Sequence, residues 1–149
     1  MVPRSLMVPA LSSLVLVSAC GYDALGPSYR GDYDLQSVNG QSVPATVYES
    51  STSSSSFSVE VTFGALHLHG DNTFSLDFDL SQWDNGAVTR STHGFSGTYD
   101  LSGGDLYLYF IDPNTNRDRT LSGFVRDRYA EVTIDGVIDG QLLRYAFSR

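Results

Sequence analysis

The chain has 149 residues and carries 17 acidic side chains against nine basic ones, for a net charge of −8 at pH 7. A surface of this sign repels phosphate backbones, which excludes nucleic acid as a partner. With only one cysteine, the chain forms no internal disulfide, so its stability must come from a hydrophobic core, and its length suits a single domain.

The N-terminus has the three parts of a secretion signal. A short basic start at Arg4 is followed by an apolar stretch from Leu6 to Val17 and by small residues up to Ala19. The segment Val17-Ser18-Ala19-Cys20 resembles the signal of bacterial lipoproteins, which places an aliphatic residue three positions before a lipidated cysteine. The resemblance implies cleavage between Ala19 and Cys20 and a lipid on the Cys20 sulfur.

Two other interpretations of this segment stay open, a membrane-spanning helix and an ordinary secretory signal. The apolar stretch is shorter than the roughly 18 to 20 residues that a spanning helix needs, and it contains Pro9. The residue after the cysteine is Gly21. In Gram-negative lipoproteins an aspartate there favours the inner membrane, so the resemblance implies an outer-membrane lipoprotein that faces the periplasm.

The sequence divides into a signal peptide at 1–19, a lipidated tether at 20–30 and a β domain at 31–149. From Gly31 onward, short alternating runs rich in Tyr, Phe, Val, Leu and Thr are separated by Gly, Asn, Asp and Ser clusters. This pattern predicts an antiparallel up-and-down meander of eight or nine short strands. Such a meander closes into a small barrel to remove its edges, and a two-sheet sandwich is the alternative.

Hairpin positions follow from the alternation. Asn39-Gly40 predicts a tight turn between strands at 32–38 and 42–49. In the clearest pair, Leu68 should face Phe74 and Leu66 should face Leu76 around the loop 70–72. Further turns are expected at 102–105 and 126–129, Val125 is expected opposite Ala130, and a loop is expected at 83–86.

One strand changes its apolar face along its length. Phe57, Val59, Val61 and Phe63 share one parity, whereas Leu66 and Leu68 have the other. The change at Gly64 predicts a β-bulge or a bend of the kind that small barrels need in order to curl.

The opening Gly31-Asp32-Tyr33 occupies the place of the Gly-x-Trp motif at the first strand of lipocalins. Because of this motif and the strand pattern, the domain resembles the small barrels of the lipocalin-like group. The resemblance implies a carrier of a small apolar ligand. Large inward side chains favour a filled core instead. The strand from Thr89 to Leu101 is an exception, because the polar residues Thr89, Ser91 and His93 share one of its faces. If the barrel holds a ligand pocket, it is expected at this end, but a strand end that emerges into water or a bulge at His93-Gly94 is the better interpretation.

Two groups of residues carry side chains that could bind a metal ion. His67 and His69 share a strand face with Asp77 on the next strand, but this spacing is unspecific, and an exposed polar face explains it as well. The segment Asp112–Asp118 alternates oxygen-bearing residues, yet Arg117 stands where calcium loops need glycine. An Asx-rich turn is the better interpretation, and no metal or cofactor is expected.

Tyr107 and Tyr109 alternate with Leu106, Leu108 and Phe110, so this strand is apolar on both faces. A loop, the tether or a partner protein should cover its outer face. The chain lacks a Gly-x-Ser-x-Gly elbow, a His-Glu-x-x-His pair and a phosphate-binding glycine loop. The sequence therefore predicts a non-enzymatic envelope lipoprotein that acts as an interaction or structural module, with the carrier as the alternative.

Overall fold

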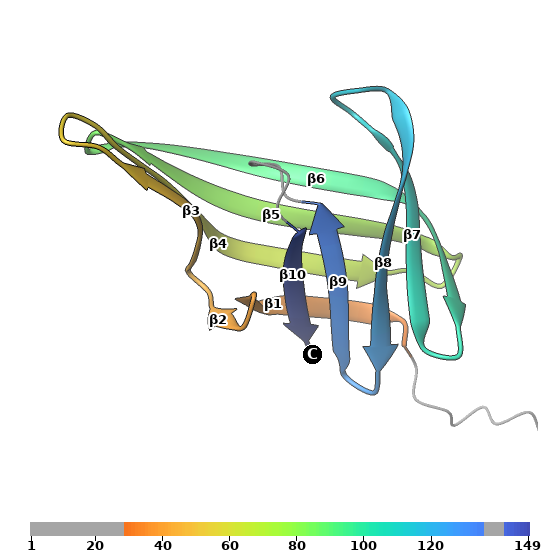
Figure 1. The fold of residues 1–149 in the computed structure, drawn as a ribbon. Coiled ribbons are helices and arrows are strands. Elements are labelled where there is room, and N and C mark those ends of the chain that lie inside the picture. The colour runs from red at the N-terminus through yellow and green to blue at the C-terminus, as the bar shows by residue number, and fades with distance from the viewer. Residues whose placement is uncertain (1–28, 136–141) are drawn as a thin grey trace, which may run out of the picture.

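The computed structural model describes residues 29–135 and 142–149, and Figure 1 shows an all-β architecture in this part of the chain. The strands are β1 (Gly31–Val38), β2 (Gln41–Ser42), β3 (Ala45–Ser51), β4 (Ser56–Leu68), β5 (Thr73–Asp84), β6 (Ala87–Ser102), β7 (Asp105–Asp112), β8 (Arg117–Arg126), β9 (Tyr129–Asp135) and β10 (Leu142–Ser148). All neighbouring strands are antiparallel, as the alternating pattern predicted.

Eight of these strands form a closed barrel. The sheet runs in the order β1, β10, β9, β8, β7, β6, β5, β4, and β4 pairs back onto β1. This closing contact places Gly31 opposite Leu68 and Asp34 opposite Ala65. The predicted meander and its closure are therefore confirmed, and the sandwich alternative does not apply.

The apolar core lies inside the barrel and draws on every strand except β2. The buried cluster comprises Tyr33, Leu35, Val38, Ala45, Val61, Leu66, Leu68, Phe74, Leu76, Phe78, Tyr99, Leu106, Leu108, Phe110, Leu121, Val125, Ala130, Val132, Leu143, Tyr145 and Phe147. Burying this many large side chains supplies the driving force that a chain without an internal disulfide requires.

The clearest predicted hairpin has the expected register. Leu66 lies opposite Leu76, and Leu68 lies opposite Phe74. The turn at 102–105 pairs Ser102 with Asp105, as expected. The parity of the alternating side chains fixed these pairings, because a slip by one residue would turn the whole apolar set toward water.

The predicted change of face in β4 is present, but it occurs earlier than expected. The register between β4 and β5 shifts between Val61 and Phe63, not at Gly64. Phe63 is 48% exposed and does not share the buried face of Val61. Gly64 serves a different purpose, because a Cβ there would lie 2.9 Å from the Phe78 ring. The bulge bends the strand, and the glycine lets the core pack against its backbone.

Two other expectations were wrong in detail. The strand predicted at 42–49 is divided in two, because β2 pairs with β1 whereas β3 pairs with β4, and the cis peptide between Val43 and Pro44 lies between them. The loop expected at 83–86 is only a two-residue turn, because Trp83 and Asp84 still pair with β6. Asn85 and Gly86 both have positive φ, of 48° and 87°, as this tight hairpin requires.

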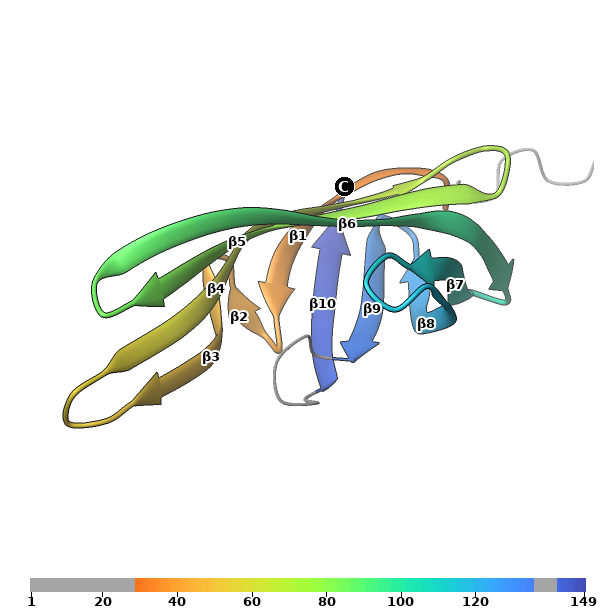
Figure 2. The same ribbon diagram turned by 90° about the horizontal axis from the view of Figure 1, so that it is seen from above.

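Long strands extend beyond the barrel on one side. β6 pairs with β5 from Ala87 to Thr98, but it pairs with β7 only from Gly97 to Ser102. Figures 1 and 2 show the tips of the β3–β4 and β5–β6 hairpins projecting beyond β7–β10. We call residues 46–60 and 81–92 the arm, and residues 87–96 of β6 the open edge. Every residue of β6 from Ala87 to Thr92 is exposed.

No helix in residues 29–135 and 142–149 has the length and apolar character needed to cross a membrane.

Candidate functional site

The predicted lipidation site, Cys20, and the cleavage site between Ala19 and Cys20 lie outside the described residues. The described chain begins just before the barrel, where the Tyr33 hydroxyl donates a hydrogen bond to the Tyr29 carbonyl oxygen at 2.7 Å. The Arg149 guanidinium lies 4.6 Å from the centre of the Tyr33 ring. The chain therefore enters the barrel beside its own C-terminus, at the end that carries the β4–β5 turn.

Aromatic rings occupy the barrel interior. The ring of Phe78 lies 4.6 Å from that of Tyr145 and 6.3 Å from that of Phe147, and Phe95 meets Phe110 edge-on at 5.0 Å. Burial raises the pKa of the Tyr145 phenol to about 12, because the charged phenolate would lose its hydration. These contacts agree with the expectation that large inward side chains fill the core.

The three residues predicted to line a ligand pocket lie on or beside the arm. Thr89 and Ser91 are exposed and His93 is half-buried. The Ser91 hydroxyl and the His93 ring nitrogen Nε2 lie 3.3 Å apart. These side chains share the face of Phe95, as expected, but they lie where β6 has left its contact with β7. A role for them in ligand binding stays a prediction.

Outward-facing apolar side chains form a row along β7. Tyr107 is 37% exposed and Tyr109 is 43% exposed, and Ile111 continues the row at 61%. Polar residues flank the row, and Tyr109 lies between Thr98 of β6 and Thr120 of β8. We call Tyr107, Tyr109 and Ile111 the β7 row. Sequence reasoning missed Ile111, although the alternation that selected the two tyrosines continues to it.

His67 of β4 has a different partner from the one that the sequence indicated. His67 Nδ1 lies 2.8 Å from Asp32 Oδ1, across the β1–β4 contact that closes the barrel. The hydrogen bond from His67, and then its charge, lower the pKa of the Asp32 carboxyl. His67 stacks with His69 at 6.4 Å. In the described ranges, no three His, Cys, Asp or Glu side chains form a group that would hold a metal ion.

The Asp112 segment is a turn, as expected. Asp112 Oδ1 accepts hydrogen bonds from the backbone N–H groups of Asn114 at 2.8 Å and Thr115 at 3.3 Å. Both bonds lower the pKa of the Asp112 carboxyl, and the bond from Asn114 lowers it most. Asn116 completes the turn with a φ of 52°. The side chain thus organises the β7–β8 hairpin in the manner of an Asx turn.

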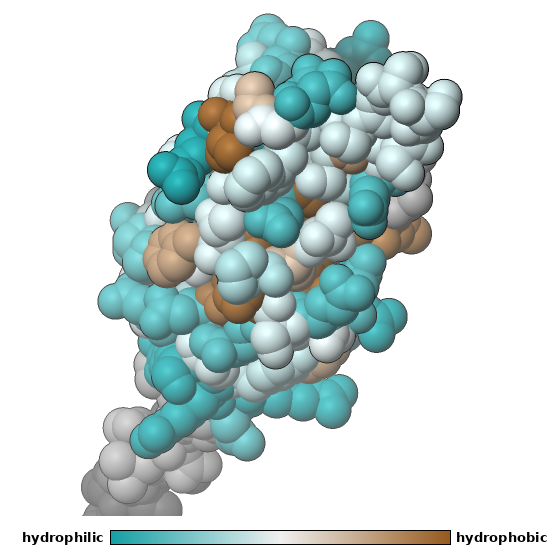
Figure 3. Space-filling view, turned by 90° about the vertical axis from the view of Figure 1, so that its left-hand side faces the viewer, coloured by the Kyte–Doolittle hydropathy of each residue, from teal (hydrophilic) through white to brown (hydrophobic). Residues whose placement is uncertain are grey.

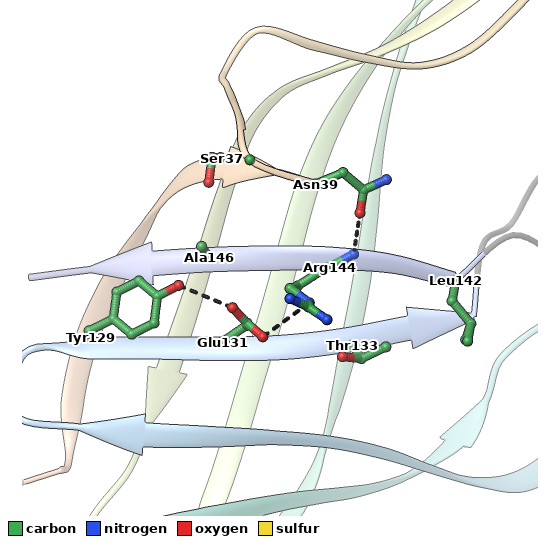
Figure 4. Close-up of a pocket in the computed structure, with 9 residues that line it drawn as sticks. Ser37, Asn39, Tyr129, Glu131, Thr133, Leu142, Arg144 and Ala146 are labelled. Atoms are coloured by element: carbon green, nitrogen blue, oxygen red, sulfur yellow. Dashed lines mark hydrogen bonds and ion pairs between the residues drawn. The ribbon is translucent and has the colours of Figure 1, made fainter.

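A hollow of about 510 Å³ lies on the outer side of β1, β9 and β10, and Figure 4 shows the residues around it. Glu131 lies at its centre, where its carboxylate accepts a hydrogen bond from the Tyr129 hydroxyl at 3.2 Å and pairs with Arg144 Nε at 3.2 Å. Burial raises the pKa of the Tyr129 phenol most. The charge and the hydrogen bond of Glu131 raise it further. These three polar side chains therefore satisfy one another within the hollow.

The side of the arm carries small apolar patches. Figure 3 views the molecule from the side of the arm, and its brown apolar patches are separated by hydrophilic residues. Single apolar side chains at a surface are ordinary in soluble proteins, whereas a row of three on one strand is not. The β7 row places three such side chains on one strand, and on the arm the exposed Trp83 lies opposite the exposed Val88 of the open edge.

Neither a protein-family model, nor a curated protein, nor a solved structure matches this chain.

Proposed function

We propose that this protein is a lipid-anchored module of the bacterial cell envelope that binds another protein and catalyses no reaction. The observation that carries the proposal is the β7 row, where Tyr107, Tyr109 and Ile111 face outward on a barrel whose interior is already filled. Tyrosine is enriched at protein interfaces because it offers a large apolar area together with a hydroxyl group.

The proposed anchor gives the barrel an orientation. A lipid on Cys20 would leave the tether 20–30 to enter the barrel at Gly31, beside Leu68. The Asn85–Gly86 turn lies at the opposite end of β5, a strand of 12 residues, which corresponds to roughly 35–40 Å of extended chain. The arm would then point away from the membrane, and the β7 row would lie along the side of the barrel.

The anchor is tested with Cys20→Ser. The parent should incorporate labelled fatty acid and partition into detergent, whereas the variant should remain an uncleaved or soluble precursor. Equal detergent partitioning of both proteins would contradict the lipid anchor.

The β7 row is tested by placing a photo-activated cross-linking residue at Tyr107 in the full-length protein in growing cells. We expect one discrete protein adduct that is lost when Tyr109 and Ile111 are both changed to Ser. The matched control carries Phe63→Ser, which removes an equally exposed aromatic side chain from β4. Persistence of the adduct in the double variant, or its loss in the control, would reject the row as the binding surface.

The alternative carrier function makes an opposite prediction. A carrier should take up a hydrophobic dye with saturable stoichiometry and should gain stability as the dye concentration rises. We expect neither, because the rings of Phe78, Tyr145 and Phe147 already meet in the interior. Saturable uptake that is blocked by larger side chains at Ser91 and His93 would favour the carrier.

A further inference from the structure

Within the described residues, one set of backbone groups along the open edge of β6 has no partner strand. The N–H of Tyr99 donates to the Asn72 carbonyl oxygen at 2.8 Å, on the β5 side. The β5–β6 ladder has no register shift, and in antiparallel strands the residues point alternately to one side and the other. Odd-numbered residues of β6 therefore bond to β5. The even-numbered residues Val88, Arg90, Thr92, Gly94 and Ser96 direct their N–H and C=O groups to the open edge.

This edge lacks the features by which proteins normally protect exposed strands. Between Ala87 and Ser96 there is no proline and no lysine, the ladder to β5 has no bulge, and Arg90 is the one charged side chain. Such an edge is a template for another strand. The β7 strand covers β6 from Gly97 onward, so an added strand would end at Ser96.

We propose that the added strand is the same edge of a second copy, which forms a two-fold symmetric, antiparallel dimer. Only one register pairs all five even-numbered residues of the open edge with the same five residues of the second copy. Thr92 then lies opposite Thr92 of the second copy, Arg90 opposite Gly94, and Val88 opposite Ser96. The Thr92 hydroxyl bonds to Asp79 Oδ1 of its own chain at 2.7 Å, which holds this side chain away from the symmetry axis.

Charge complementarity argues for a second copy over an unrelated peptide. A Cβ on Gly94 would lie 2.6 Å from Asp77 Oδ1, so the Asp77 carboxylate lies beside a residue that has no side chain. Arg90 and Asp77 are on the same outer face, and neither makes an ion pair with any described residue. In the proposed register, Arg90 would cross Gly94 of the second copy and reach its Asp77. Because the dimer is two-fold symmetric, this ion pair would form twice.

The dimer is tested with the full-length protein in excess detergent by sedimentation equilibrium up to about 1 mM, which detects weak association. We expect a monomer–dimer equilibrium in the parent. Arg90→Asp and Asp77→Arg should each raise the dissociation constant by at least about tenfold, because each places like charges together across the interface. The double variant that exchanges the two charges should restore the parent value.

A proline variant tests the backbone pairing itself. Thr92→Pro removes an N–H that faces the open edge, so the bonds between β5 and β6 should remain while the dimer is lost. Circular dichroism checks that the variant is folded. Should it fail to fold, the charge variants still test the proposal, because Arg90 is exposed and lies outside the core.

Amide hydrogen exchange supplies a third test with an alternating pattern. The odd-numbered amides of the open edge should be protected at every protein concentration, whereas the even-numbered amides should gain protection only as the concentration rises. A protein that is monomeric throughout, a dimer that survives Thr92→Pro, or a double charge variant that fails to recover would overturn the proposal. The test leaves the β7 row unchanged, so the proposed function and this inference can fail separately.

Discussion

The two halves of this barrel use strands of different length. From β7 to β10 each strand has seven to ten residues, and β7 alternates buried Leu106, Leu108 and Phe110 with exposed neighbours along its whole length. In the other half β6 has 16 residues, and only its second part follows this alternation. The comparison teaches that backbone pairing alone does not define the folded core. Along β6 the buried residue, Tyr99, lies where β7 pairs with the strand, although the β5–β6 ladder continues to Ala87.

The arm is held by neighbouring strands and by side chains on its two faces. β5 has a partner on both sides along the arm, with Trp83 between Ser58 of β4 and Val88 of β6. Tyr48 and Phe57 meet edge-on at 5.8 Å. Cross-strand pairs of this kind each contribute roughly 0.2–1 kcal/mol, which is much less than a side chain buried in the barrel.

The largest expected effect separates the core from the arm. Phe74→Ala should lower the free energy of unfolding by about 3–5 kcal/mol, since Phe74 is buried opposite Leu68 and its loss leaves a cavity. Ser91→Ala on the arm and His69→Ala at the barrel end should each change it by no more than about 0.5 kcal/mol. Urea unfolding of the three variants measures the difference. Similar losses in all three would mean that the arm is as tightly packed as the barrel.

The boundary between the two halves can be tested at Gly97, the first residue of β6 that pairs with β7. A Cβ there would press on the carbonyl oxygen of Tyr109, which is backbone and has little freedom to move. Gly97→Ala should therefore cost about 1–3 kcal/mol. Gly70→Ala is the control, because nothing lies within 4 Å of its added Cβ. If thermal unfolding shows equal stability for both, β6 and β7 are less closely joined than the structure indicates.

The smallest expected effect concerns alkaline stability. The Tyr145 phenol has a folded pKa of about 12, above its ordinary value of 10, so the fold favours the neutral form. Its contribution to stability is complete below pH 10 and is lost as the pH rises toward 12. Tyr145→Phe should weaken this alkaline loss, whereas the exposed Tyr107→Phe should not. Denaturant midpoints measured from pH 9 to 12 give the comparison, and identical slopes would show that Tyr145 ionises freely.

Glycine positions show how far a sequence pattern can be interpreted. Gly97 and Gly123 each follow a serine, and both lie within strands. A Cβ on Gly123 would press on the carbonyl oxygen of Glu131, as one on Gly97 would on Tyr109. The two glycines thus share a role that depends on a neighbouring strand. Sequence alone shows the residue type, whereas the close approach that requires it is a tertiary contact.

The candidate surfaces were predicted in part. Alternation along one strand placed Tyr107 and Tyr109 outward, because side chains point to opposite faces with a period of two. The same rule placed His67 outward, but it indicated Asp77 as its neighbour. Its observed partner, Asp32, is 35 residues away and meets it across the closing strand pair. The open edge was also missed, because whether a strand has a second neighbour is not encoded within that strand.

The sequence by itself determined the all-β class and the register of the clearest local hairpins, because alternation and turn residues act between neighbours in the chain. The pairing of β1 with β4, the point where β7 leaves β6 and the split at Pro44 were decided only by the tertiary structure. Each depends on segments that meet across the barrel, and their contacts leave no local periodic signal. The filled interior, the arm and the open edge all follow from that closure.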